Sequence, residues 1–299
     1  MVKVSVSISC ATIIYNPTSG KRRFDLVQRL AQALRASNIA TDLLETHYKG
    51  HGTHLARQLA EQGYEGCLVA AGGDGTIAEI ATGLDGTNIP LALFPTGTAN
   101  VLAMELGITG EIPQLVSLIT TARTRWIWPG WLETDSDRFM FLQMAGVGFD
   151  GAVVHGVTPH TKRRFGKLAY VFQTYRQLLA YRFPDFALLV DGVPFSCKGV
   201  LVSKGRFYGG KFRLLSLSRQ HETGFSVLLM NGNGPLTALR TAAALLFGRV
   251  EHLSCIRCLQ ASEISVNASP SIPIQSDGDA RGMTPVRITS ATHPMLVFC

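Results

Sequence analysis

The stretch Gly66-Cys-Leu-Val-Ala-Ala-Gly-Gly-Asp-Gly-Thr-Ile-Ala-Glu-Ile-Ala-Thr-Gly83 decides how the rest of the chain is interpreted. Its apolar first part, residues 66–71, has the length of a buried strand, and Gly72, Gly73 and Gly75 interrupt it. From Thr76 onward, apolar residues recur at helical spacing. The stretch therefore predicts a strand, a tight glycine turn and the N-terminus of a helix.

This junction has the chemistry of an anion site. The first N–H groups and the positive end of the helix dipole point to one place, and glycines let an anion approach the backbone. We expect a phosphate there, bound at Gly72, Gly73, Gly75 and Thr76. Asp74 in the same turn is expected to serve a bound cation or its water network. The alternative is a corner whose glycines only supply positive φ, but three glycines and an acid exceed what such a turn requires.

The composition limits the partners. The chain has 299 residues, a formal charge of +7 and a pI near 9.2, with 46% hydrophobic and 16% charged residues, which excludes a disordered polymer. Positive charge suits nucleotides, nucleic acid or an anionic membrane. The longest apolar helix candidate, Leu236 to Phe247, contains Arg240 and is shorter than the roughly 20 residues that a membrane span needs.

The cysteines indicate a reducing compartment. Six are spread over the chain, two of them in predicted buried strands, so we interpret them as reduced thiols of a cytosolic protein: Cys10, Cys67, Cys197, Cys255, Cys258 and Cys299. The pair Cys255 and Cys258 has no second pair and would face opposite sides of a strand, which argues against a metal site. The N-terminus lacks the continuous apolar core of a signal peptide.

Two further turns resemble the central one. Asn16-Pro-Thr-Ser-Gly-Lys-Arg22 follows a predicted strand, Ala11 to Tyr15, but Tyr15 replaces the first glycine of a Walker loop. Pro95-Thr-Gly-Thr-Ala-Asn100 follows another strand. The alternation of apolar runs with amphipathic helices predicts a doubly wound α/β sheet. Its turns at 16–21, 72–76 and 95–100 are expected to gather at one edge, where one ligand could touch all three.

The pattern changes after about Thr124. Short β-like runs separated by turn signals such as Asp277-Gly278 predict an antiparallel β domain, interrupted by helix candidates at 162–182 and 236–248. The motif Gly146-Val-Gly-Phe-Asp-Gly151 fits a dinucleotide fingerprint. That fingerprint expects an acid about 20 positions on, and none occurs between Gly151 and Pro184, so a tight β turn is favoured.

Five blocks in order resemble the diacylglycerol kinase catalytic-domain family, which includes bacterial soluble lipid kinases, sphingosine kinases and ceramide kinases. They are Asn16-Pro-Thr-Ser-Gly20, Gly72-Gly-Asp-Gly-Thr-Ile-Ala-Glu79, Pro95-Thr-Gly-Thr-Ala-Asn-Val101, Gly146-Val-Gly-Phe-Asp150 and Phe207-Tyr-Gly-Gly210. The glycine turn alone would also admit NAD kinases and 6-phosphofructokinases, but the tract Gly97-Thr-Ala-Asn100 followed by a β domain favours the lipid kinases.

The resemblance implies an ATP- and Mg²⁺-dependent enzyme of two domains. Residues 1–124, joined by 290–299, would form the nucleotide-binding α/β domain, and 125–289 a β-sandwich-like lipid-acceptor domain, with ATP in the cleft between them. Catalysis would use Asp74, through the metal, and Asp279, which takes the acceptor proton. The residues expected to contact the nucleotide are Asn16, Ser19, Thr46, Gly72, Gly73, Gly75, Thr76, Glu79 and Thr98.

Two departures from the family pattern bear on the mechanism. Asp279 stands where the family usually has glutamate, so the acceptor or the backbone must lie closer for a general base to act. Threonine replaces the acid of the family's structural magnesium turn at Thr223-Gly224, which makes that second metal site doubtful. Taken alone, Asp277-Gly278 is typical of a hairpin turn.

The stretch His160 to Arg182 has six basic residues and no acid, interleaved with aromatic and aliphatic residues. This composition suits a helix on an anionic membrane surface. The alternative is a helix packed on the β domain with a solvated basic side.

Together these observations predict a cytoplasmic, peripherally membrane-associated lipid kinase with a lipid alcohol as acceptor and no nucleic-acid partner. The alternatives are an NAD kinase-like enzyme with a soluble acceptor and a regulator that has lost catalysis. A homo-oligomer remains open, as does the identity of the lipid.

Overall fold

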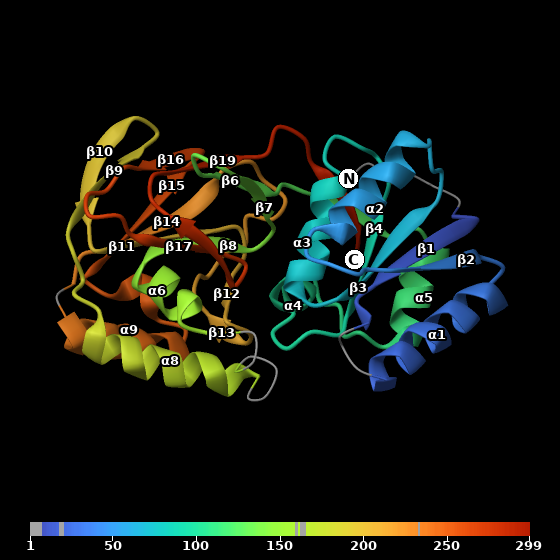
Figure 1. The fold of residues 1–299 in the computed structure, drawn as a ribbon, viewed down its shortest axis with the longest axis horizontal. Coiled ribbons are helices and arrows are strands. Elements are labelled where there is room, and N and C mark those ends of the chain that lie inside the picture. Colours follow the sequence, from blue (N-terminus) through green and yellow to red (C-terminus); the bar gives the residue numbers. More distant parts are fainter. Residues whose placement is uncertain (1–7, 18–20, 159–160, 162–165, 233) are drawn as a thin grey trace. The chain divides into compact units, whose positions relative to one another are not determined.

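The computed structural model describes residues 8–17, 21–158, 161, 166–232 and 234–299 (Figure 1). The chain divides into two compact units, Met1–Trp128 with Thr292–Cys299, and Pro129–Ala291. The first unit extends past the expected boundary at residue 124 because strand β5 (Thr124–Ile127) pairs with β20 (Met295–Phe298), the last strand of the chain.

The first unit is an α/β domain around one six-stranded sheet in the order β2-β1-β3-β4-β20-β5. The first four strands are parallel, as the predicted alternation requires: β1 (Cys10–Tyr15), β2 (Ala40–Glu45), β3 (Cys67–Gly72) and β4 (Leu91–Pro95). Helices α1 and α5 cover one face and α2 and α3 the other (Figure 1). The helices are α1 (Lys21–Ala36), α2 (His51–Glu61), α3 (Asp74–Gly83), α4 (Val101–Glu105) and α5 (Ile112–Thr120).

The second unit is a sandwich of two antiparallel six-stranded sheets that enclose one apolar core. One sheet has the order β10-β9-β16-β19-β6-β7, with β6 (Gly130–Glu133), β7 (Arg138–Phe141), β9 (Phe186–Val190), β10 (Val193–Cys197), β16 (Glu263–Val266) and β19 (Val286–Ser290). The other has the order β15-β14-β11-β8-β17-β18, with β8 (Met144–Gly148), β11 (Gly199–Ser203), β14 (Phe225–Met230), β15 (Ile256–Ala261), β17 (Pro273–Ser276) and β18 (Asp279–Met283).

Helices and a short ribbon lie outside this sandwich (Figure 1). They are α6 (Phe149–His155), α8 (Lys167–Ala180), α9 (Gly234–Leu246), the 3₁₀ helix η2 (Val250–His252) and the pair β12 (Phe207–Tyr208) and β13 (Phe212–Arg213). Residues 162–165 of the first predicted helix lie outside the described part of the chain.

The apolar run at residues 139–144 is divided between two strands. Strand β7 ends at Phe141 and β8 begins at Met144, because Asp277 takes the N–H groups of the residues between them. The six cysteines are free thiols, and no helix among the described residues has the length and apolarity to cross a membrane.

Candidate active site

The glycine turn lies where the sequence predicts it, between β3 and α3. Gly72 ends the strand, Gly73 is the N-cap and Asp74 begins the helix. Gly72, Gly73 and Gly75 all have negative φ, which excludes the interpretation that they only supply positive φ. Glycine is needed for space: a Cβ on Gly72 would overlap the side chain of Thr76, and one on Gly73 would lie 3.2 Å from the Cα of Gly97.

The turn after β4 is bonded to this glycine turn. The N–H of Thr96 donates to the carbonyl of Gly72 at 2.9 Å. Asn100, in the left-handed region with φ 51°, accepts the N–H of Gly97 through Oδ1 at 2.9 Å. The two turns therefore form one backbone-lined surface at the carboxyl ends of β3 and β4, and the lack of side chains at Gly73 and Gly97 suits a bound phosphate.

Asp74 links the same two turns. Its Oδ1 accepts the N–H of Val101 at 2.8 Å, at the start of α4. The described residues contain no group of three acids, histidines or cysteines placed to hold a metal. Mg²⁺ in phosphate sites is commonly bound by one or two carboxylates together with substrate phosphates. A single carboxylate in a phosphate turn therefore fits that ion.

Two of the expected nucleotide contacts have their polar atoms engaged within the protein. Both carboxylate oxygens of Glu79 accept backbone N–H groups at the start of α2, from Gly50 at 2.8 Å and Gly52 at 3.2 Å. The hydroxyl of Thr46 is buried and donates to the carbonyl of Tyr15 at 3.3 Å. Both side chains fix backbone segments of the first unit, and this role was not predicted from the sequence.

The remaining expected contacts lie on loops. Asn16 directly follows β1, and its N–H donates to the carbonyl of Ala71 at 3.4 Å, which brings the first turn next to the end of β3. Thr98 is exposed on the turn after β4. Ser19 lies outside the described residues.

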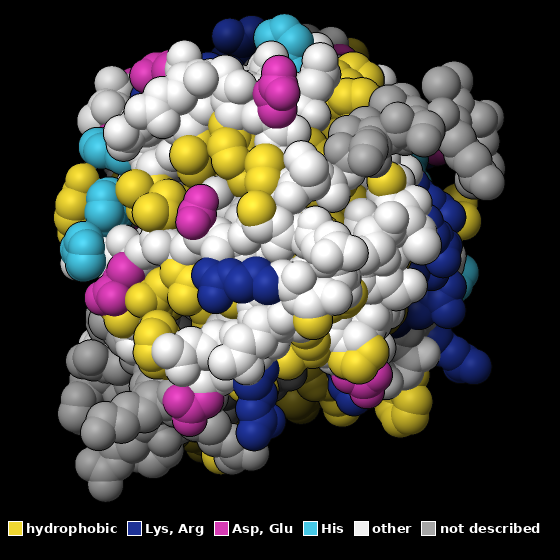
Figure 2. Space-filling view, turned by 90° about the vertical axis from the view of Figure 1, so that its right-hand side faces the viewer, with side chains coloured by type: hydrophobic (Ala, Val, Ile, Leu, Met, Phe, Trp, Pro, Cys, Tyr) yellow, Lys and Arg dark blue, Asp and Glu magenta, His cyan; other side chains and the backbone are white. Residues whose placement is uncertain are grey.

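A cluster of aromatic and imidazole rings follows β2. It was not predicted from the sequence. The rings of Tyr48 and His51 stack with centroids 4.6 Å apart, and His47 and His54 lie beside them. The histidines at 47, 51 and 54 have the i, i+4, i+7 spacing that brings side chains together on a helix, and this spacing could have indicated the cluster. Figure 2 shows histidine side chains grouped at the left margin of the face that it presents.

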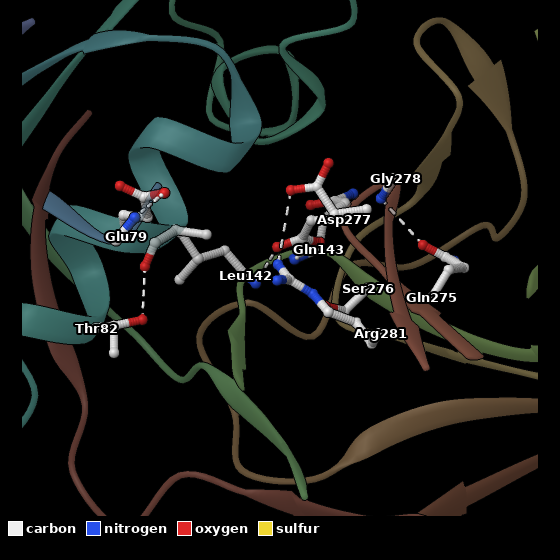
Figure 3. Close-up of polar contacts among 12 residues, drawn as sticks. Glu79, Thr82, Leu142, Gln143, Gln275, Ser276, Asp277, Gly278 and Arg281 are labelled. Atoms are coloured by element: carbon white, nitrogen blue, oxygen red, sulfur yellow. Dashed lines mark hydrogen bonds and ion pairs between the residues drawn. The ribbon is translucent and has the colours of Figure 1, made fainter. Parts of the chain in front are cut away.

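In the second unit, Asp277 is a structural residue. It joins β17 to β18 with Gly278, both in the left-handed region at φ 47° and 80°. Its carboxylate accepts the N–H groups of Leu142 at 2.7 Å, Gln143 at 3.0 Å and Met144 at 2.9 Å (Figure 3). The hairpin that Asp277-Gly278 predicts is therefore present and is tied to the loop between β7 and β8.

Asp279 is the second acid of this hairpin. It is the first residue of β18, and its side chain is 32% exposed. Its Oδ2 lies 3.7 Å from Nη2 of Arg281, whose side chain is almost buried. Arg281 also donates to Ser276 Oγ at 2.8 Å and covers the ring of Phe139. The carboxylate therefore lies beside a fixed cation on a fixed turn.

A buried hydrogen-bond network joins the hairpin to residues of the sequence blocks 146–150 and 207–210. Asp150 accepts hydrogen bonds from the hydroxyl of Tyr208 and, at 2.5 Å, from Nε2 of Gln275. The Oε1 of Gln275 accepts the N–H of Gly278 at 3.0 Å. Burial raises the pKa of Asp150, although the two hydrogen bonds oppose it, and burial and Asp150 raise that of Tyr208 well above its usual value. The block at 146–150 is glycine-rich because a Cβ on Gly146 would overlap the Asp150 carboxylate, and it serves this network.

Lys204 forms hydrogen bonds to the turn at Thr223-Gly224. The buried ammonium of Lys204 donates to the carbonyls of Glu222 at 2.5 Å and Gly224 at 2.8 Å. Burial, with a smaller contribution from Arg219, lowers the pKa of Lys204 to about 7. Glu222 lies in this turn, and its carboxylate pairs with Arg219 at 2.6 Å.

Comparisons with known proteins agree with this architecture. The model of the diacylglycerol kinase catalytic domain matches residues 10–129, and that of the YegS C-terminal NAD kinase beta sandwich-like domain matches residues 143–299. A diacylglycerol kinase of Bacillus subtilis is 30% identical over 283 residues, covering 92% of this chain and 91% of its own.

Two more distant similarities extend over nearly the whole chain. A diacylglycerol kinase of Staphylococcus aureus is 26% identical over 295 residues, covering 96% of this chain and 91% of its own. A crystal structure of a diacylglycerol kinase from Bacillus anthracis superimposes with a TM-score of 0.69 at 18% identity, covering 97% of this chain and 96% of that one. At that identity the superposition supports the fold alone.

Proposed function

Because the chain belongs to the family of the diacylglycerol kinase catalytic domain, we propose that it transfers the γ-phosphoryl group of ATP to the hydroxyl of a lipid alcohol. A diacylglycerol-like alcohol is the first candidate acceptor, with ceramide or a sphingoid base as the others. Phosphoryl transfer requires that the protein holds the phosphates, balances their charge and aligns the hydroxyl.

The nucleotide half of the reaction is assigned to the first unit. The N–H groups at the start of α3 and the backbone of the turn at 95–100 would hold phosphate oxygens, since Gly73 and Gly97 leave room for close approach. Asp74 would hold Mg²⁺ together with the phosphates, and the ion supplies charge stabilisation when it is bound. Glu79 and Thr46 act indirectly, because their hydrogen bonds fix the neighbouring backbone.

The acceptor half is assigned to Asp279. Its carboxylate would take the proton of the acceptor hydroxyl as that oxygen attacks the γ-phosphorus and the bond to the β-phosphate oxygen breaks. The observation that carries this assignment is the position of Asp279: it begins β18 on a hairpin that Asp277 ties to the loop before β8, and its side chain is 32% exposed beside Arg281.

The test is a thin-layer screen of radiolabelled ATP against diacylglycerol, monoacylglycerol, ceramide and a sphingoid base in mixed micelles, with NAD as a soluble acceptor. A labelled lipid product supports the proposal. Labelled NAD without a labelled lipid would replace it with an NAD kinase-like activity. Binding of ATP with no product from any acceptor would favour a regulator that has lost catalysis.

A further inference from the structure

Helix α8 presents its apolar side to solvent. Leu168, Val171, Phe172, Tyr175 and Leu179 recur at helical spacing and are all exposed, Phe172 by 67% and Leu179 by 72%. On the inward side, Ala169 and Gln173 are buried. The sequence left open a packed helix with a solvated basic side, but the exposed side of the described helix is largely apolar.

Helix α9 repeats this arrangement. Leu236, Leu239, Leu246 and the following Phe247 are exposed, Phe247 by 78%. Its inward side chains, Ala244 and Leu245, pack on the small core beside β14. Helices α8 and α9 contact each other and lie side by side on one side of the sandwich (Figure 1). They form one continuous surface, the α8–α9 face.

The two helices of the α8–α9 face carry basic residues and no acid. No acidic residue occurs in the sequence between Asp150 and Asp185, or between Glu222 and Glu251, although these two segments contain eight lysines and arginines. Among these, Arg176 and Arg240 lie on the two helices and are exposed. Exposed apolar side chains gathered on one face mark an interaction site. The absence of acids favours an anionic partner.

We infer that the α8–α9 face docks on a lipid bilayer with anionic headgroups. Leucine, phenylalanine and tyrosine side chains on the outer sides of two helices can enter the boundary between headgroups and acyl chains. The surrounding arginines attract anionic lipid. A second copy of this chain is a poorer occupant, because two such faces would bring their positive charges together.

A hydrogen bond connects this face to the candidate acceptor site. The hydroxyl of Tyr170, on α8, donates to the carbonyl of Gly278 at 3.2 Å, next to Asp279. This step rests on the proposed function: if Asp279 serves a lipid hydroxyl, the helix that meets the bilayer is the helix that touches its hairpin. The docking face itself is independent of catalysis.

The test is co-sedimentation of the whole chain with vesicles, without ATP. We expect binding to vesicles of equal parts phosphatidylcholine and phosphatidylglycerol, and much less binding to phosphatidylcholine alone. Phe172→Asp and Leu239→Asp should each weaken binding at least about tenfold, because an apolar contact is lost. Arg176→Glu should weaken it about fivefold or more, and added salt should do the same.

The matched control is Val193→Asp on β10, a strand of the sandwich away from α8 and α9, where the side chain is 53% exposed (Figure 1). It should bind vesicles as the wild type does. Circular dichroism shows whether each variant is folded. Equal binding by folded Phe172→Asp, Leu239→Asp and wild type would overturn the inference. A wild-type dimer in lipid-free sedimentation velocity that Phe172→Asp dissociates, with vesicle binding unchanged, would also overturn it and assign the face to a second copy.

Vesicle co-sedimentation without ATP measures docking separately from the proposed kinase activity. Loss of vesicle binding in the face variants supports the docking face even if the acceptor screen detects no labelled lipid. A labelled lipid product together with unaffected vesicle binding by the face variants would refute the docking face and support the kinase activity.

Discussion

The side chain of Asp74 and the backbone of Val101 are joined by a hydrogen bond of 2.8 Å, which ties the first turn of α3 to the first turn of α4. The acid that the sequence assigned to a cation is therefore also a structural link between two turns. The structural role and the proposed metal role should respond differently to substitution, because an amide can still accept the hydrogen bond but cannot supply the charge.

Asp74→Asn should abolish phosphoryl transfer and leave the fold intact. The asparagine Oδ1 can replace the acceptor of the Val101 N–H, so the free energy of unfolding should stay close to that of the wild type. Asp74→Ala should lose activity and also about 1 kcal/mol of stability, because the helix start loses its partner. Turnover with varied Mg²⁺, and urea unfolding of both variants, provide the check. Near-normal turnover of Asp74→Asn with normal Mg²⁺ dependence would refute the metal role.

Asp279→Asn should lower kcat about 10²-fold or more and leave ATP affinity nearly unchanged, since the residue is assigned to the acceptor. Asp279→Glu restores the longer side chain that is usual in the family. Activity should be kept or raised if the site has not adapted to aspartate, and lowered if the extra methylene crowds the hydroxyl. Steady-state kinetics on the best lipid alcohol test both. Wild-type turnover of Asp279→Asn would mean that another group accepts the proton.

Asp277→Ala should destabilise the second unit by about 3 kcal/mol, because three backbone N–H groups lose a charged acceptor. Asp191 is a matched control: it forms the same kind of turn with Gly192, and its carboxylate accepts the N–H groups of Ser262 and Glu263. Asp191→Ala should also destabilise but keep kcat, whereas Asp277→Ala should lower kcat by misplacing Asp279. Urea unfolding combined with turnover distinguishes the two, and equal loss of kcat in both would argue against a local role for the hairpin.

Because the pKa of Lys204 is lowered in the folded protein, the free energy of unfolding should rise with pH. That pKa is lowered to about 7 in the folded protein, whereas the unfolded chain keeps the ordinary value near 10.5. Between these values the unfolded chain binds more protons, so the free energy of unfolding increases with pH, by at most about 1.4 kcal/mol per pH unit. Below pH 7 the cost of the buried charge is fully present.

Lys204→Met removes this titration. Urea unfolding at pH 7, 8 and 9 should show the wild type gaining stability relative to Lys204→Met at each step. Parallel pH profiles for the two proteins would contradict the lowered pKa.

The sequence by itself determined the fold class and the position of the glycine turn. Buried strands, amphipathic helices and a glycine turn are local patterns, because the period of the apolar residues and the clustering of the glycines are visible within a few residues. The strand–turn–helix at 66–83 could therefore be located before any tertiary contact was known, and so could the hairpin at Asp277-Gly278.

Only the tertiary structure decided what the polar side chains do. The carboxylate of Asp277 accepts a backbone N–H from a residue 135 positions away in the chain, and that of Glu79 accepts one from 29 positions away. The network of Asp150 with Tyr208, and the bonds from Lys204 to the carbonyls of Glu222 and Gly224, are equally non-local. The outward side of α8 was undecided for the same reason. Periodicity shows that a helix has an apolar side, but only packing determines whether that side faces the core or the solvent.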